Sequence, residues 1–299
     1  MKIVLLGPGL MGSQIACEYA LGGHEVVVLA RRPDVAGERI ERGFSTARVH
    51  RLANPEDVAA ARKRMTIAEE SAGADDARII VESVVEDLAA KKEALLPVVT
   101  RNPDAIVASN TSSIPITAIG AAIGAGERTV GAHYWNPPLL MPMVEVIRGD
   151  ETAEAVVTEM TATLRALGKR PVLVDRDVQG FAWNRLQLAL LRGAVWLVEN
   201  GVASPATVDE IVRDGLARRW RYTGPFQTAA LGGAATFERV ANLLWPALST
   251  ATSLENLRRW LDESPETTGP LRERRDRGLT ADMQADRHRE HGGAPGGPS

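Results

Sequence analysis

Apolar residues in the first half of the chain fall into short, nearly continuous runs, at 3–6, 25–30, 77–85, 105–109, 129–132 and 144–147. Such runs are typical of strands that are buried on both faces of a sheet. Between them, 11–21 and 88–100 have helical spacing, and 39–70 is polar with helical spacing, which predicts a helical arm. Strands that alternate with helices predict a doubly wound α/β fold whose parallel sheet is covered on both faces.

The pattern changes near residues 176–180, and the helical period dominates from there on. Apolar residues share one helical face at 181, 188, 191, 195 and 198. Ser204 followed by Pro205 predicts the start of a further helix, since Ser is a favoured N-cap and Pro suits the first helical position. We therefore expect a sheet domain at 1–178, an all-helical domain at 179–285 and a Gly/Pro-rich, disordered tail at 286–299.

Composition narrows the class of protein and its surroundings. Of 299 residues, 44% are hydrophobic and 24% charged, and no apolar run reaches the ~18 residues that a membrane span needs. Glycines break the apolar start of the chain too early for a signal peptide. Cys17 is the single cysteine, which excludes an internal disulfide and favours a reducing cytoplasm. The net charge of −3 gives no electrostatic reason to expect a nucleic-acid partner.

A glycine-rich turn with Gly7, Gly9 and Gly12 follows the first predicted strand and opens the first predicted helix. Glycines at this spacing allow a tight turn, the approach of a pyrophosphate to the backbone and close packing of helix on strand. The helix N-terminus offers free N–H groups and the positive end of its dipole to phosphate. The turn predicts a Rossmann-type dinucleotide site; the alternative interpretation is a tight turn without a ligand.

The end of the second predicted strand bears on the choice between NAD and NADP. An acidic residue about twenty positions after the glycines usually binds the ribose 2′-hydroxyl of NAD. The corresponding position here is Ala30, followed by Arg31 and Arg32. Two guanidinium groups can bind a 2′-phosphate through charge-assisted hydrogen bonds. We expect NADP or NAD, with NADP favoured; the alternative is that the two arginines are a solvated surface pair.

One histidine lies at a position where it could act as a catalytic base. Oxidation of a secondary alcohol needs a base for the hydroxyl proton, and histidine titrates near neutrality. Of the five histidines, only His133 ends a predicted sheet strand, where sites of α/β proteins form. Asn136-Pro137-Pro138 is a turn signal that would fold the strand of Glu145 back towards His133. The sequence has no Cys/His pattern typical of a metal site, and we expect no metal.

Five segments together carry a family resemblance: GPGLMGSQIA (7–16), ASNTSSIPIT (108–117), GAHYWNPPLLMPMVEVI (131–147), DVQGFAWNR (177–185) and GPF (224–226). In order and spacing they resemble the 3-hydroxyacyl-CoA dehydrogenase family across nearly the whole chain. The second half looks most like the branch that contains λ-crystallin (an L-gulonate 3-dehydrogenase) and the carnitine dehydrogenases, which act on small free 3-hydroxy acids. The resemblance implies NAD(P)-dependent interconversion of an L-3-hydroxy acid and its 3-oxo acid by hydride transfer. It also implies a homodimer formed through the helical domain.

The resemblance assigns roles to individual residues as well. It makes His133 the general acid/base and Glu145 its partner. Ser112 and Asn184 would donate hydrogen bonds to the substrate oxygen as charge develops on it. The residues expected to bind the cofactor are Gly7, Gly9, Leu10, Met11, Gly12, Arg31, Arg32, Glu86, Lys91, Asn110 and Asn136.

Several alternatives stay open at this point. Arg219 and Arg221 are candidates to bind a substrate carboxylate, or they belong to a solvated helix face. The pair Glu86 and Lys91 would otherwise be an exposed helix pair. A CoA thioester is a second candidate substrate, although the polar arm is short and lacks the Lys- and Ser-rich character of the CoA enzymes. A lysine-dependent β-hydroxyacid dehydrogenase needs a lysine on the interdomain helix, and the last of only five lysines, Lys169, precedes that helix. A non-catalytic, crystallin-like protein has no physical need of the complete set of catalytic candidates.

Overall fold

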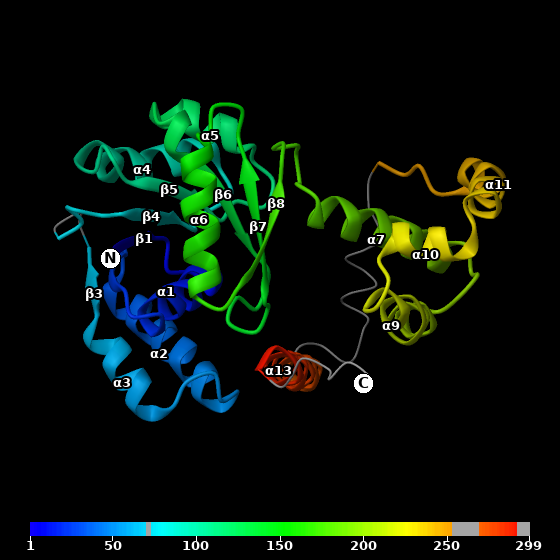
Figure 1. The fold of residues 1–299 in the computed structure, drawn as a ribbon, viewed down its shortest axis with the longest axis horizontal. Coiled ribbons are helices and arrows are strands. Elements are labelled where there is room, and N and C mark those ends of the chain that lie inside the picture. The colour runs from blue at the N-terminus through cyan, green and yellow to red at the C-terminus, as the bar shows by residue number, and fades with distance from the viewer. Residues whose placement is uncertain (70–72, 253–268, 292–299) are drawn as a thin grey trace, which may run out of the picture. The chain divides into compact units, whose positions relative to one another are not determined.

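The computed structural model describes residues 1–69, 73–252 and 269–291, and its core is an eight-stranded sheet (Figure 1). The strand order is β3-β2-β1-β4-β5-β6-β7-β8. Neighbouring strands are parallel except for the antiparallel pair β6 and β7. The strands are β1 (Lys2–Leu6), β2 (Glu25–Leu29), β3 (Met65–Ala68), β4 (Ile79–Glu82), β5 (Ile106–Ser109), β6 (Thr129–Tyr134), β7 (Met143–Arg148) and β8 (Arg170–Val174).

Helices cover both faces of this sheet, which confirms the predicted doubly wound fold. They are α1 (Leu10–Leu21), α2 (Pro33–Val49), α3 (Pro55–Lys63), α4 (Leu88–Arg101), α5 (Ile116–Ile123), the 3-10 turn η1 (Gly126–Arg128) and α6 (Glu154–Ala166). Alternate residues of β1 point to opposite faces: Ile3 and Leu5 join the core under α1, α2, α3 and α6, whereas Val4 and Leu6 join the core under α4 and α5. Strands with both faces buried explain the continuous apolar runs in the sequence.

The polar stretch 39–70 is only partly the helical arm that its spacing predicts. It contains most of α2, all of α3, and then the strand β3, which pairs in parallel with β2 at the sheet edge. The four residues of β3 are half-buried or exposed, so they lack the apolar run that marks the central strands. The other edge strand, β8, is similarly exposed and was not predicted.

The chain divides into two compact units. The first contains residues 1–182 together with α13 from Arg272 onward, and the second is Trp183–Leu271. The second unit is helical, as expected, and Ser204 caps α8 by accepting a hydrogen bond from the Thr207 N–H. Its elements are α7 (Trp183–Glu199), α8 (Pro205–Glu210), the π-helical turn η2 (Ile211–Leu216), α9 (Ala217–Trp220), α10 (Pro225–Gly232), α11 (Ala234–Leu244) and the 3-10 turn η3 (Trp245–Ala247).

A long C-terminal helix, α13 (Gly269–His291), follows the second unit. From Arg272 it groups with the sheet unit, where the Thr280 hydroxyl lies 2.6 Å from His50 Nδ1. Of the tail predicted at 286–299, the helix holds the first residues, and 292–299 lie outside the described residues. The predicted boundaries at 178 and 285 stay predictions. Within the described part of the chain, none of the helices has both the length and the apolar character needed to cross a bilayer.

Candidate active site

The residues singled out in the first half of the sequence gather at one edge of the sheet. The parallel strands β1, β2, β4, β5 and β6 all end there, and β7 begins there because it runs antiparallel to β6. In open α/β sheets, ligands bind outside the carboxyl ends of the strands. The glycine turn, the Arg31-Arg32 pair, the loops after β4 and β5, and His133 therefore share the edge where such sites form.

The glycine turn has the geometry that a pyrophosphate requires. Gly7 has a φ of +83°, a conformation that glycine adopts without strain, and a Cβ at this position would overlap the backbone of Ser83. A Cβ on Gly12 would overlap the carbonyl oxygen of Gly7. Gly9 faces open space. The N-terminus of α1 is therefore bare backbone, which fits a dinucleotide phosphate at the positive end of the helix dipole.

A cavity of about 700 Å³ opens beside this turn. The glycine turn lines one side of it, and Ala30, Arg31 and Arg32 at the end of β2 line another. Both arginines are exposed, so their guanidinium groups are accessible to a ligand. The volume falls within the usual range for small-molecule sites, ~300–1,000 Å³. The cavity fits the adenosine half of a dinucleotide.

Three further charged residues, which were not singled out from the sequence, line this cavity: Arg39, Glu69 and Glu93. Arg39 of α2 donates from Nη1 to the Pro8 carbonyl at 3.2 Å, which ties a third guanidinium to the glycine turn. Glu69 directly follows β3, whose last residue pairs in register with the end of β2. Arg39 follows Arg32 by two helical turns, and this spacing could have indicated that both face the same side. Glu69 could be identified only once β3 was known to pair with β2.

Lys91 is buried and pairs with two carboxylates, whereas Glu86, which precedes α4, is partly exposed; the two are therefore not a solvated pair on one helix. Lys91 Nζ lies 2.7 Å from Glu82 Oε1 and 3.2 Å from Glu86 Oε2, and its side chain is 1% exposed. Glu82, fully buried at the end of β4, also accepts hydrogen bonds from the Ser109 hydroxyl and the Val84 N–H. Sequence reasoning did not single out Glu82. A carboxylate inside the apolar run IIVESVV could have indicated it, because a charged residue is rarely buried without a partner.

The second carboxylate of this network holds the loop after β5. Glu86 Oε1 accepts hydrogen bonds from the Thr111 hydroxyl at 2.7 Å, the Ser112 N–H at 2.8 Å and the Ser113 N–H at 2.7 Å. Burial raises the pKa of Glu86, but the Thr111 hydroxyl, the Lys91 charge and the two N–H groups outweigh it and lower the pKa to about 2. Glu86 is thus a fixed anion that orders the loop of Ser112.

Asn110 joins three strand ends. Its Oδ1 accepts a hydrogen bond from the Tyr134 N–H at 2.8 Å, and its Nδ2 donates to the Ser83 hydroxyl at 3.2 Å. These contacts link the loops after β4 and β5 to the residue that follows His133. Asn136 is exposed at the start of the loop between β6 and β7. Leu10 and Met11 begin α1, and Leu10 is 65% exposed.

His133 and Glu145 form a buried pair across β6 and β7. The two residues are partners in the antiparallel register, as the turn signal at Asn136 predicted. His133 Nδ1 lies 2.7 Å from Glu145 Oε2, and the two residues are 4% and 1% exposed. Glu145 Oε1 accepts a hydrogen bond from the Ala182 N–H at 3.2 Å, and the imidazole packs on the Phe181 ring with 5.7 Å between centroids.

This arrangement can move a proton. The carboxylate fixes the imidazole tautomer with the proton on Nδ1, so that Nε2 keeps a free electron pair for an incoming proton. The same carboxylate stabilises the imidazolium that results. An oxidised nicotinamide bound at the strand ends would accept the hydride, and the pair is suited to the accompanying acid–base chemistry on a carbinol.

The other expected substrate residues belong to the second unit. Asn184 lies in the first turn of α7, Arg219 in α9, and Arg221 at the C-cap of α9. Arg219 lines a cavity of about 440 Å³ within this unit. Its other walls combine hydroxyl groups with aromatic and aliphatic side chains: Tyr222, Thr223, Thr228, Leu231, Gly232 and Phe237.

A histidine–carboxylate pair at the edge of a dinucleotide-binding sheet defines a class, the dehydrogenases that use a nicotinamide dinucleotide. Family models make the class specific. Residues 2–178 match the NAD binding domain of 3-hydroxyacyl-CoA dehydrogenase, and 180–266 match its C-terminal domain. The chain belongs to the 3-hydroxyacyl-CoA dehydrogenase family, and it is an NAD(P)-dependent oxidoreductase.

Individual relatives support the same placement. The 5-formyl-3-hydroxy-2-methylpyridine 4-carboxylate 5-dehydrogenase of Mesorhizobium japonicum is 37% identical over 257 residues, which cover 83% of this chain and 81% of that protein. An L-carnitine dehydrogenase of Streptomyces griseus is 34% identical over 78% of this chain and 70% of its own. A crystal structure of the pyridine-carboxylate enzyme, described as an NAD+-dependent dismutase, superposes with a TM-score of 0.83 at 30% identity and covers 95% of this chain and 97% of that chain.

Proposed function

We propose that the protein interconverts a small L-3-hydroxy acid and its 3-oxo acid, with His133 as the general acid/base. The observation that carries this proposal is the 2.7 Å contact between His133 Nδ1 and Glu145 Oε2, buried at the edge of the dinucleotide-binding sheet. In the oxidative direction His133 Nε2 accepts the hydroxyl proton, and Glu145 stabilises the imidazolium. In the reductive direction the imidazolium returns the proton to the carbonyl oxygen.

Hydrogen-bond donors complete the proposed chemistry. When bound, the nicotinamide accepts or supplies the hydride. Ser112 and Asn184 orient the reacting oxygen and offset the charge that develops on it. Glu86 supports this role of Ser112, because it holds the backbone of the loop through the Ser112 and Ser113 N–H groups.

We further propose that NADP is preferred over NAD. Arg31, Arg32 and Arg39 surround the cavity beside the glycine turn, and a 2′-phosphate would gain charge-assisted hydrogen bonds from them. One observation favours the rival cofactor. The Glu69 carboxylate lines the same cavity, and it could accept a hydrogen bond from the 2′-hydroxyl of NAD.

The proposed substrate is a free carboxylic acid. Arg219 provides a guanidinium for its carboxylate in a cavity that also has hydroxyl groups, and Arg221 follows at the end of the same helix. The pyridine 4-carboxylate and L-carnitine relatives act on small carboxylates, which supports this choice. A CoA thioester is the second candidate, because a probable 3-hydroxybutyryl-CoA dehydrogenase of Bacillus subtilis is 35% identical over 72% of this chain. A non-catalytic, crystallin-like binding protein is the third.

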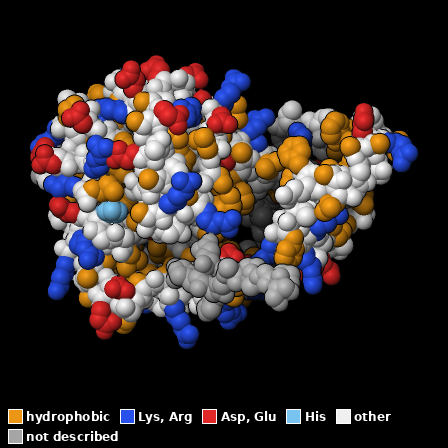
Figure 2. All heavy atoms as spheres, viewed as in Figure 1, with side chains coloured by type: hydrophobic (Ala, Val, Ile, Leu, Met, Phe, Trp, Pro, Cys, Tyr) orange, Lys and Arg blue, Asp and Glu red, His pale blue; other side chains and the backbone are white. Residues whose placement is uncertain are grey.

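We also propose a cytoplasmic homodimer. The single cysteine, Cys17, is buried and unpaired, as suits a reducing compartment. Hydrophobic side chains lie at the surface of the second unit (Figure 2). Leu186, Leu231, Leu243 and Trp245 of this unit are 68–79% exposed. Apolar exposure of this kind is typical of an association surface.

A substrate screen tests the proposal. Small L- and D-3-hydroxy acids, including carnitine and 3-hydroxybutyrate, would be offered with NADP+ or NAD+, and matched CoA thioesters would follow in parallel, with reduced cofactor read by absorbance. We expect turnover of an L-3-hydroxy acid and a lower KM for NADP+ than for NAD+. Turnover of thioesters alone would select the second candidate. Cofactor binding without turnover of any compound would select the third, and a lower KM for NAD+ would refute the cofactor preference.

A further inference from the structure

Lys169 is a buried ammonium group placed between a loop and a helix. It directly precedes β8, and its side chain is 5% exposed. Nζ donates to the Pro138 carbonyl at 2.7 Å and to the Met141 carbonyl at 2.9 Å, and it forms an ion pair with Glu18 Oε2 at 2.9 Å. The two carbonyls accept hydrogen bonds from the ammonium group, and the Glu18 carboxylate supplies its counter-charge.

Both carbonyls belong to the loop 135–142, which joins β6 to β7. Within it, the N–H groups of Leu140 and Met141 donate to the Pro137 carbonyl, each at 3.0 Å, which gives the loop a tight turn. His133 lies just before this loop and Glu145 just after it. The ammonium group thus holds the connection between the two members of the catalytic pair.

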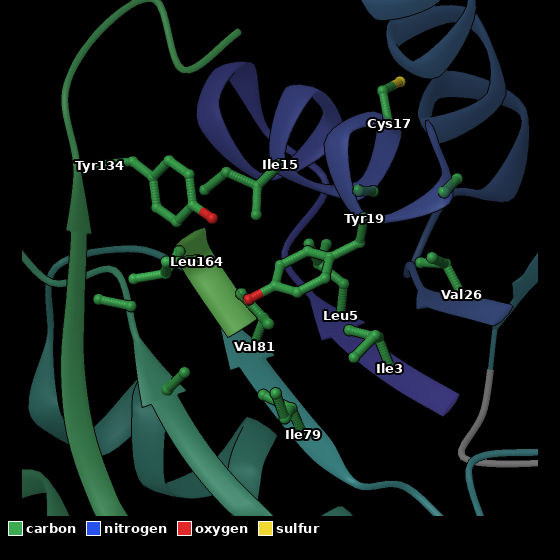
Figure 3. Packing of buried hydrophobic residues seen from close by; sticks show 14 of the residues in the cluster. Ile3, Leu5, Ile15, Cys17, Tyr19, Val26, Ile79, Val81, Tyr134 and Leu164 are labelled. Atoms are coloured by element: carbon green, nitrogen blue, oxygen red, sulfur yellow. The ribbon is translucent and has the colours of Figure 1, made fainter. Parts of the chain in front are cut away.

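The same side chain reaches the helix that follows the glycine turn. Glu18 lies in α1, whose N-terminus is the dinucleotide site. Lys169 Nζ also lies 5.9 Å from the centroid of the Tyr134 ring, at the end of β6. Figure 3 shows the Tyr134 ring extending from β6 towards α1, beside Ile15. One residue therefore touches the cofactor helix, the strand of His133 and the loop after it.

The ion pair between Lys169 and Glu18 adds little net stability by itself. Burial raises the pKa of Glu18, and the Lys169 charge opposes that effect. Removing two charges from water costs free energy that their attraction often only offsets, and well-packed apolar residues of similar volume commonly serve as well. An apolar pair, however, offers no donor to the carbonyls of Pro138 and Met141.

We infer that Lys169 is a positioning residue, which holds the loop 135–142 so that His133 and Asn136 keep their places relative to a cofactor on α1. The inference rests on the proposed function and deepens it. Loss of this hold should loosen the loop and slow hydride transfer, because misplacement of reacting groups by even ~1 Å costs up to ~100-fold in rate.

Three variants separate the effect of losing the hydrogen bonds to the loop from the effect of leaving a buried charge unpaired. Lys169→Met leaves Glu18 without its counter-ion and should lower the midpoint of urea unfolding. The double variant Glu18→Met/Lys169→Met removes both charges, and we expect its midpoint to lie above that of Lys169→Met. Lys169→Arg keeps donors for both carbonyls and should retain a slowly exchanging loop. Lys2→Met is the matched control, because Lys2 Nζ also donates to two loop carbonyls, those of Gly73 and Asp75.

Hydrogen exchange and steady-state kinetics of these variants test the inference. By hydrogen exchange, peptides of 136–142 in the double variant should exchange about fivefold faster or more, while peptides of β1 and β4 keep the wild-type rate. With the fastest wild-type substrate among L-carnitine, 3-hydroxybutyrate and 3-hydroxybutyryl-CoA, kcat should fall roughly 10- to 100-fold. The dissociation constants of NADP+ and NAD+ should stay within about twofold, as should every value for Lys2→Met.

Unchanged exchange of the loop, or a wild-type kcat in the folded double variant, would overturn the inference. His133→Ala is assayed alongside to keep the two claims apart. If His133→Ala retains the wild-type kcat, the proposed function fails whatever Lys169 does. If His133→Ala is impaired and the double variant is not, only the positioning role of Lys169 fails.

Discussion

At the scale of single residues, neighbouring carboxylates at the strand ends do different work because their partners differ. Glu145 lies against the His133 imidazole, so its charge can stabilise a proton arriving on that ring. Glu86 accepts from hydroxyl and N–H donors and lies beside Lys91, which keeps it ionised. The first carboxylate therefore suits the support of an imidazole that gains and loses a proton, and the second suits the ordering of a loop.

Glu86 should contribute a pH-dependent part of the stability. Its pKa is lowered from 4.5 to about 2 in the folded protein, so between these values the unfolded chain binds more protons and stability rises with pH. The contribution is fully present above about pH 4.5 and is lost as the pH falls towards about 2. We expect the difference in unfolding free energy between wild type and Glu86→Gln to shrink over this window.

Urea unfolding at a series of pH values measures that difference. Asp57→Asn would serve as a control for loss of one exposed carboxylate. A difference between wild type and Glu86→Gln that stays constant from pH 5 to about pH 2.5 would show that Glu86 is not the anion described here.

At the scale of elements, the turn between β1 and α1 depends on the absence of side chains. A Cβ on Gly12 would overlap the Gly7 carbonyl, and backbone cannot give way as a flexible side chain can. We expect Gly12→Ala to weaken NADP+ or NAD+ binding by about tenfold or more, as measured by fluorescence titration with the reduced cofactors.

Gly193→Ala provides the matched control for that substitution. Gly193 lies inside α7, where an added Cβ meets nothing within 4 Å. Alanine should be accepted there, since it favours a helix over glycine by roughly 1 kcal/mol. Equal cofactor affinity in Gly12→Ala and Gly193→Ala would contradict the account of the turn.

Sequence reasoning succeeded for elements whose burial leaves a clear pattern. The central strands were predictable because burial of both faces requires a continuous apolar run. The glycine turn was predictable because close backbone packing requires glycines at fixed spacing. The edge strands β3 and β8 were missed because their residues are half-exposed and so carry no apolar run. His133 and Glu145 were found through the turn at Asn136 and the family resemblance. Glu82 and Glu69 were missed because their importance arises from strand neighbours far away in the sequence.

At the scale of the whole molecule, the described part of the second unit has several large apolar side chains that are exposed. Leu243 of α11 is 76% exposed, and large apolar side chains of α7 and α10 are exposed as well. Exposed apolar side chains that cluster on one unit are typical of an association surface. We expect sedimentation of the wild type as a particle of about twice 32.1 kDa.

Substitution of that surface should weaken the dimer. Leu243→Lys places a charge in the proposed interface and should shift the sedimentation equilibrium towards monomer. Val49→Lys, at a position 72% exposed in α2, is the matched control and should leave the dimer intact. A monomeric wild type, or an unchanged dimer in Leu243→Lys, would contradict the proposal that the apolar surface of this unit forms the dimer interface.

The most direct measurement of the central claim is kcat for His133→Ala on the substrate found in the screen. We expect a fall of about 10²- to 10⁴-fold, the usual contribution of general acid–base catalysis, with cofactor affinity unchanged. His50→Ala, whose imidazole contacts Thr280, should keep kcat within about twofold. A loss of less than about tenfold in His133→Ala would contradict the account, because the imidazole paired with Glu145 would then not be the base.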